Sequence, residues 1–117
     1  MISNFFDLNH IRIEISFYSI DDLRSKLLFY QNNKIYKLNI PCKNNLKKDF
    51  LLRSLKMAKE EFPQIDIIPH YSIQHQFRRN RINTQNDLIQ FLYILKDIGY
   101  NEILLVSGSK KRQHLIP

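Results

Sequence analysis

The feature that most constrains this chain is a regular alternation between short strand-like segments and longer helix-like segments. Strand patterns cover residues 11–17, 35–40, 65–73 and 103–106, and a helical pattern fills each interval between them. One strand and one helix together take roughly 30 residues, the length of a unit that joins two parallel strands. The alternation therefore predicts an α/β fold with a parallel sheet.

The helical segments carry local signals for their ends. The periodicity predicts helices over about residues 19–30, 48–61 and 84–98. The first and third begin with Ser or Thr followed three residues later by Asp, the spacing of an N-terminal cap. Pro63 prevents the second helix from continuing, and Gly99 is placed to end the third.

The number and length of these units indicate a larger architecture. Four strands with units of this length match the first half of an eight-fold strand–helix (TIM) barrel. Residues 1–117 are therefore expected to form a single α/β domain or half barrel, and the alternative is a small open doubly wound sheet. A half barrel has two open sheet edges and an uncovered inner face. We therefore expect a homo-oligomer or a partner chain to cover the open sheet.

Composition excludes several classes of protein. The chain has 44% hydrophobic and 25% charged residues, which is typical of a folded domain. No apolar run approaches the roughly 20 residues that span a membrane, so no membrane association is predicted. Residues 1–10 lack the pattern of a secretory signal, and the single cysteine, Cys42, fits a reducing compartment. These observations predict a cytoplasmic location.

Basic residues gather in three segments that each follow the carboxyl end of a predicted strand. The segments are 43–48, 78–81 and 110–112, and the net charge of the chain is +7. The carboxyl ends of parallel strands share one edge, where α/β folds bind their ligands. The clusters therefore predict an anionic ligand, although solvated lysine-rich loops would give the same pattern. With two glycines, the chain has neither a Rossmann fingerprint nor a P-loop.

A non-catalytic module that binds a polyanion or nucleic acid through these three segments is an alternative function. Tyr71, Phe77 and Tyr93 would then provide aromatic surfaces on which bases stack, near the arginines of 78–81. No established nucleic-acid-binding motif accompanies them.

Two titratable residues are the main candidates for chemistry. Glu14 alternates with the apolar residues of the first strand, so it points away from the helices, which in a barrel means into the interior. An exposed edge strand, or a structural pairing near Arg12, would explain Glu14 equally well. His70 lies at the end of the third strand and has the parity of Asp66 and Ser72.

Other chemistry at His70 has less support. The histidine and cysteine spacings match no zinc pattern, so no metal site is predicted. Cys42 and His70 can face the same edge as a nucleophilic pair, but no third residue completes it.

The second half of the chain combines a strand that ends in Pro69-His70, the helix from Thr84, and the segment 95–109 with its Ile-Gly turn and final strand. In these features it resembles the methylenetetrahydrofolate reductase family. That family has an eight-fold strand–helix barrel, binds FAD, and reduces methylenetetrahydrofolate with a nicotinamide cofactor. The resemblance implies that this chain covers the first half of such a barrel. It is therefore expected to be a divergent relative, either truncated and inactive or part of a longer reading frame.

The resemblance implies roles for particular residues. Glu14 falls at the catalytic glutamate of the family, FAD would be the bound cofactor, NAD(P)H the reductant, and a folate-type molecule the substrate. Ser109 stands where the family has the acid that contacts the flavin. The residues expected to hold FAD are His70, Ser72, Arg78, Arg79, Ser109 and Lys110.

Overall fold

The computed structural model describes residues 10–41, 48–72 and 81–106, with the backbone alone for 81–85. Within these ranges strands and helices alternate as predicted, which confirms an α/β fold. The strands are β1 (Ile13–Glu14), β2 (Lys37–Ile40), β3 (Asp66–Ser72) and β4 (Leu104–Val106). The helices are α1 (Ile20–Asn32), α2 (Lys48–Glu61) and α3 (Arg81–Ile98).

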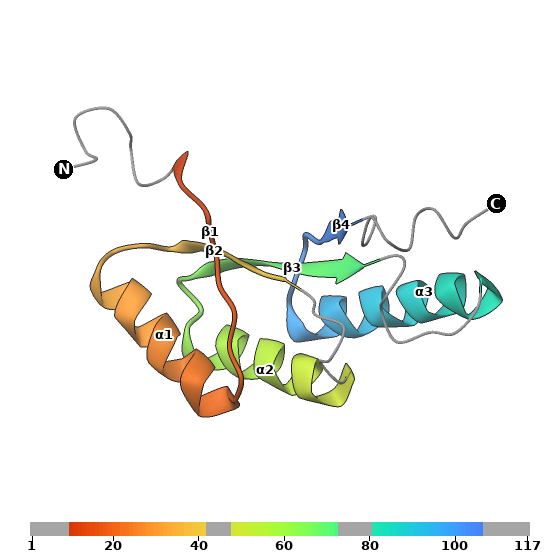
Figure 1. Ribbon diagram of the computed structural model, residues 1–117, viewed down its shortest axis with the longest axis horizontal. Helices are drawn as coiled ribbons and strands as arrows, with labels where there is room; N and C mark the ends of the chain where they lie inside the picture. The colour runs from red at the N-terminus through yellow and green to blue at the C-terminus, as the bar shows by residue number, and fades with distance from the viewer. Residues whose placement is uncertain (1–9, 42–47, 73–80, 107–117) are drawn as a thin grey trace.

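The four strands form one parallel sheet whose spatial order is the order of the sequence, β1-β2-β3-β4. All three helices lie against the same face of this sheet (Figure 1). A doubly wound sheet reverses its strand order internally and carries helices on both faces. That alternative prediction is therefore wrong for the described strands.

The core lies between the sheet and the helix layer. Side chains of the sheet and of each helix contribute to it, and all of them are almost fully buried. They include Leu38, Ile40 and Ile67 from the strands, and Leu23, Leu27, Leu51, Leu55, Phe91 and Leu95 from the helices. We call the other face of the sheet the open face, because no described helix covers it (Figure 1).

The local signals set most helix ends. The Ser19 hydroxyl accepts a hydrogen bond from the Asp22 backbone N–H at 3.0 Å, which confirms the predicted cap of α1. Helix α2 has the predicted bounds. Helix α3 ends where Gly99 adopts a φ of +118°, a backbone conformation that residues other than glycine rarely adopt.

The predicted start of α3 is wrong. The helix begins at Arg81, and Thr84 lies within its first turn. Neither glycine nor proline occurs between His70 and Ile98, so nothing in the backbone prevents the helix from starting before the Thr84 spacing pattern.

Strand β4 is less covered than its apolar sequence predicts. Residues 103–106 read as a strand buried on both faces, but Leu104 is 45% and Leu105 is 49% exposed. Among the described strands, β4 is an edge strand with only β3 as a neighbour. Strand β1, the other edge, is also shorter than the predicted 11–17, and the chain bends at residues 18–19 where it enters α1.

Candidate functional site

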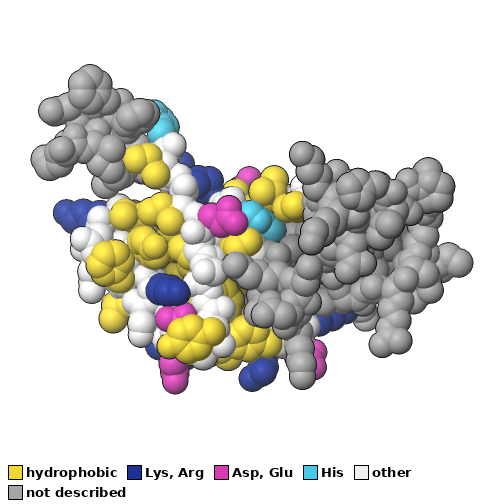
Figure 2. Space-filling model, in the orientation of Figure 1, with side chains coloured by type: hydrophobic (Ala, Val, Ile, Leu, Met, Phe, Trp, Pro, Cys, Tyr) yellow, Lys and Arg dark blue, Asp and Glu magenta, His cyan; other side chains and the backbone are white. Residues whose placement is uncertain are grey.

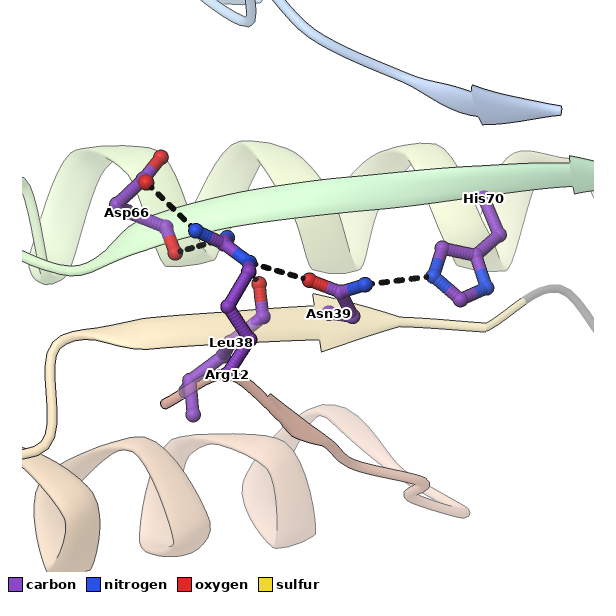
Figure 3. A network of polar contacts seen from close by, with 5 residues as sticks. All are labelled: Arg12, Leu38, Asn39, Asp66 and His70. Carbon is purple, nitrogen blue, oxygen red and sulfur yellow. Dashed lines mark hydrogen bonds and ion pairs between the residues drawn. The ribbon is translucent and has the colours of Figure 1, made fainter. Parts of the chain in front are cut away.

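The open face carries a polar network that begins at Arg12. Its guanidinium reaches across β2 to β3 (Figure 3). The Nε donates to the side-chain oxygen of Asn39 at 2.8 Å, and Nη1 donates to an Asp66 carboxylate oxygen at 2.9 Å. The Nη2 donates to the backbone carbonyls of Leu38 at 2.9 Å and Asp66 at 3.0 Å. The Arg12 side chain, from the residue before β1, thereby makes hydrogen bonds to both β2 and β3.

Asn39 passes this network on to His70. The side-chain nitrogen of Asn39 lies 3.1 Å from Nε2 of His70 (Figure 3). His70 is only 6% exposed. Burial lowers the pKa of His70 below its usual value of 6.5, while the carboxylate of Glu14 pulls the pKa upward to a smaller extent.

Glu14 completes the candidate site from β1. It is paired in register with Asn39, and its side chain is exposed on the open face. Figure 2 shows an acidic side chain next to a histidine near the centre of the molecule, with hydrophobic side chains around them. The sheet thus brings a carboxylate and an imidazole, the two candidates from the sequence, close enough to interact electrostatically. Such a pair can donate a proton or a hydrogen bond to a ligand on this face.

Tyr71 faces the opposite way, into the helix layer. Its ring packs on Phe91 with the ring centroids 5.4 Å apart, and its hydroxyl donates to Asp87 at 2.7 Å. Lys48, at the start of α2, lies 3.6 Å from the same carboxylate. The end of β3 is therefore held by both α2 and α3. Tyr71 is fully buried, so the prediction that it offers a surface for base stacking is wrong.

The remaining predicted site residues are only partly covered by the described ranges. Ser72 is buried at the end of β3 and shares the open face with His70. Arg78, Arg79, Ser109 and Lys110 lie outside the described residues. Cys42 and Phe77 lie outside them as well.

The three basic segments lie mostly outside the described residues. Lys48 is the one residue of these segments whose side chain is described, and it donates to Gln90 at 2.7 Å. The polyanion- and nucleic-acid-binding alternative therefore stays a prediction.

The sequence analysis did not identify Asn39 as a site residue. The alternation of β2 contains the signal, because Lys37 and Asn39 have the opposite parity to the core residues Leu38 and Ile40. What the pattern lacks is the register. Only the pairing of Asn39 with Glu14 on one side and Ile68 on the other shows which side chains it reaches.

Among the described residues, no group of three or more His, Cys, Asp or Glu side chains is arranged to hold a metal ion. None of the described helices combines the length and apolar character needed to cross a membrane.

Comparison of the chain with known protein families, characterised proteins and solved structures finds no match.

Proposed function

We propose that this chain is one half of a strand–helix barrel that binds FAD and acts as an oxidoreductase of the methylenetetrahydrofolate reductase type. The observation that carries the proposal is that Glu14 of β1 and His70 of β3 lie on the open face on either side of Asn39, which is paired with Glu14 and lies 3.1 Å from His70. Parallel strands in sequential order with helices on one face support the barrel geometry. In a closed barrel the open face is the interior surface, whose carboxyl end holds the active site.

The described residues suit the ring system of FAD. The flavin ring presents carbonyl oxygens and ring nitrogens, and the open face offers the N–H groups of His70 and Asn39 beside a carboxylate. When bound and reduced by NAD(P)H, FAD would supply the hydride to the substrate. The positive groups expected to meet its phosphates are the basic segments that lie outside the described residues.

The chain's own residues would do acid and positioning chemistry. Glu14 would protonate one nitrogen of the N–CH₂–N bridge in the folate-type substrate. The bond from the carbon to that nitrogen then breaks, and the lone pair of the other nitrogen forms an iminium whose carbon can accept a hydride. His70 would hold the cofactor by a hydrogen bond. Its burial favours the neutral imidazole, which can donate without adding a charge to the site.

Binding and turnover test this proposal separately. We expect added FAD to lose fluorescence on binding to the purified protein, and His70→Ala to weaken binding roughly tenfold, the loss of one hydrogen bond. We expect Glu14→Gln to retain FAD but to lower turnover of methylenetetrahydrofolate with NADH or NADPH about 100-fold or more. Glu60→Gln, an exposed acid on α2, is the matched control.

The outcomes separate the two parts of the proposal. Absence of any FAD binding at saturating concentrations contradicts it as a whole. FAD binding without any turnover by the wild type contradicts the catalytic part of the proposal. Turnover that is equal in Glu14→Gln and the wild type removes the catalytic role of Glu14.

A further inference from the structure

The network on the open face contains donors whose direction is fixed by chemistry. Arginine has five N–H donors and no acceptor, so every hydrogen bond of Arg12 runs outward from its guanidinium. The atom of Asn39 that lies 2.8 Å from Arg12 Nε must therefore be the amide oxygen. The two further contacts of Arg12 with Asp66 hold the guanidinium in place.

This orientation determines the other end of the Asn39 side chain. Because the oxygen faces Arg12, the NH₂ group faces His70, 3.1 Å from Nε2. An NH₂ group can only donate, so Nε2 must accept, and an imidazole nitrogen that accepts carries no proton. A neutral imidazole has one N–H, which leaves its proton on Nδ1. In Figure 3 the second ring nitrogen is directed away from Asn39.

From this chain of contacts we infer that Arg12 and Asn39 are positioning residues that fix His70 as the neutral Nδ1–H tautomer. The one N–H of the His70 ring then lies on Nδ1, on the side of the ring away from Asn39 (Figure 3). The ligand group that it suits is an acceptor such as a carbonyl oxygen or an unprotonated ring nitrogen. His70 thereby acts as a binding residue, and Glu14 is the residue that would donate a proton in the proposed reaction.

The charged groups around His70 are consistent with this state. Protonation of Nε2 would set an N–H against the NH₂ of Asn39 and would add a second positive charge to the network of Arg12. Glu14 on the same face favours protonation, but the burial of His70 opposes it more strongly. Asp66 is already paired with Arg12, and Asp87 and Lys48 lie on the helix side.

The tautomer can be measured directly in the ligand-free protein. Two-bond ¹H–¹⁵N correlation spectra of the ¹⁵N-labelled full chain distinguish the two neutral forms of a histidine ring and the imidazolium. At pH 7 we expect His70 to show a protonated Nδ1 and an unprotonated Nε2. An Nε2–H tautomer, or an imidazolium at this pH, overturns the inference, and this measurement needs no variant.

Reversing the direction of the hydrogen bond between Asn39 and His70 gives a sharper test. In Asn39→Asp, a carboxylate replaces the NH₂ group, so Nε2 is expected to keep its proton and to donate. The pKa of His70 should then rise by about one unit or more, the effect of a nearby carboxylate. Asn101→Asp makes the same charge change at an exposed position before β4 and should leave His70 unchanged. Equal pKa values in the two variants contradict the role of Asn39.

A second variant examines Arg12. In Arg12→Gln the guanidinium no longer determines the orientation of Asn39, so His70 should populate both neutral tautomers. Far-UV circular dichroism shows whether the variant is folded. A folded Arg12→Gln protein in which His70 remains entirely Nδ1–H means that Arg12 is not a positioning residue.

The consequence for FAD rests on the proposed function, whereas the tautomer does not. If FAD fails to bind but His70 is the Nδ1–H tautomer, the proposed function is wrong and the positioning role of Arg12 and Asn39 is retained. If FAD binds but His70 is the Nε2–H tautomer, the positioning role of Arg12 and Asn39 is wrong and the proposed function is retained.

Discussion

Lys34 adopts a backbone conformation that is unfavourable for residues other than glycine. It follows the cap of α1 with a φ of +60°, the one positive φ outside glycine among the described residues. Two hydrogen bonds close the helix around it, from Lys34 N–H to Gln31 and from Ile35 N–H to Tyr30. This is the position after a helix that glycine usually occupies.

We expect Lys34→Gly to raise the free energy of unfolding by about 1 kcal/mol, because glycine adopts this conformation without the steric cost that other residues have. Urea denaturation followed by circular dichroism measures the change. Lys34→Ala is the control, since alanine keeps the same backbone cost and should leave the midpoint nearly unchanged. A glycine variant that is less stable than the alanine variant contradicts the expectation.

Tyr100 is a buried polar residue whose stability contribution depends on pH. Its hydroxyl donates to the Leu55 carbonyl at 2.6 Å, and burial raises its pKa above the usual 10.0. The folded state therefore keeps the proton that the unfolded state loses near pH 10. Stability from this group is fully present below pH 10 and decreases as the pH rises above it.

We expect the wild type to lose more stability between pH 9 and pH 11 than Tyr100→Phe, which has no ionisable hydroxyl. At pH 7, the same variant should cost about 1 kcal/mol for the lost hydrogen bond. Denaturation midpoints across this pH range give both values. Tyr93→Phe, at a side chain that is 70% exposed, should reproduce the wild-type profile.

At the scale of elements, helix limits follow local chemistry where a cap is present. The hydroxyl of Ser19 bonds the backbone of Asp22 at the start of α1, and the carboxylate of Asp22 in turn accepts from the Tyr18 backbone N–H at 3.2 Å. Arg24 then joins α1 to the end of α2 through two hydrogen bonds to Glu61, 2.8 and 3.1 Å long. Helices α1 and α2 are thus joined by hydrogen bonds at their exposed surface as well as by packing in the core.

We expect Ser19→Ala to lower the free energy of unfolding by about 1 kcal/mol, because one backbone N–H of α1 loses its acceptor. Ser25→Ala lies within the same helix at an exposed position and should be neutral or slightly stabilising. Thermal unfolding of the two variants beside the wild type decides the point. Equal losses in both would mean that the cap contributes nothing.

At the scale of the whole molecule, the described sheet ends in two edge strands and leaves one face without helices. Strand β4 has exposed leucines on both of its faces, a pattern typical of a strand inside a larger sheet. The expectation that a second copy or a partner chain pairs with the sheet stays a prediction. The proposed barrel requires such a partner for its second half.

We expect the purified chain to associate with itself in a concentration-dependent way, and Leu105→Lys to reduce this association because a charge at a sheet edge opposes strand pairing. Light scattering after size-exclusion chromatography measures the mass. Leu28→Lys is a matched control, since Leu28 on α1 is 48% and Leu105 is 49% exposed. Equal association of both variants with the wild type shows that β4 is not the contact.

The sequence alone determined the features that depend on neighbouring residues. The cap at Ser19, the end of α3 at Gly99 and the bounds of α2 follow from hydrogen bonds and backbone preferences within a few residues. The period of two in the strands also placed Glu14 and His70 on the open face, because alternate side chains of a strand point to opposite faces.

Only the tertiary structure decided the register of the strands and therefore the network at the site. Arg12 meets Asn39 and Asp66 across separations of 27 and 54 residues, which no local pattern encodes. The same register directs Asn39 to His70 and leaves β4 at an edge, although its sequence reads as an interior strand. The physical reason is that pairing between distant strands depends on the packing of the whole helix layer, whereas the period of a strand depends on its own backbone.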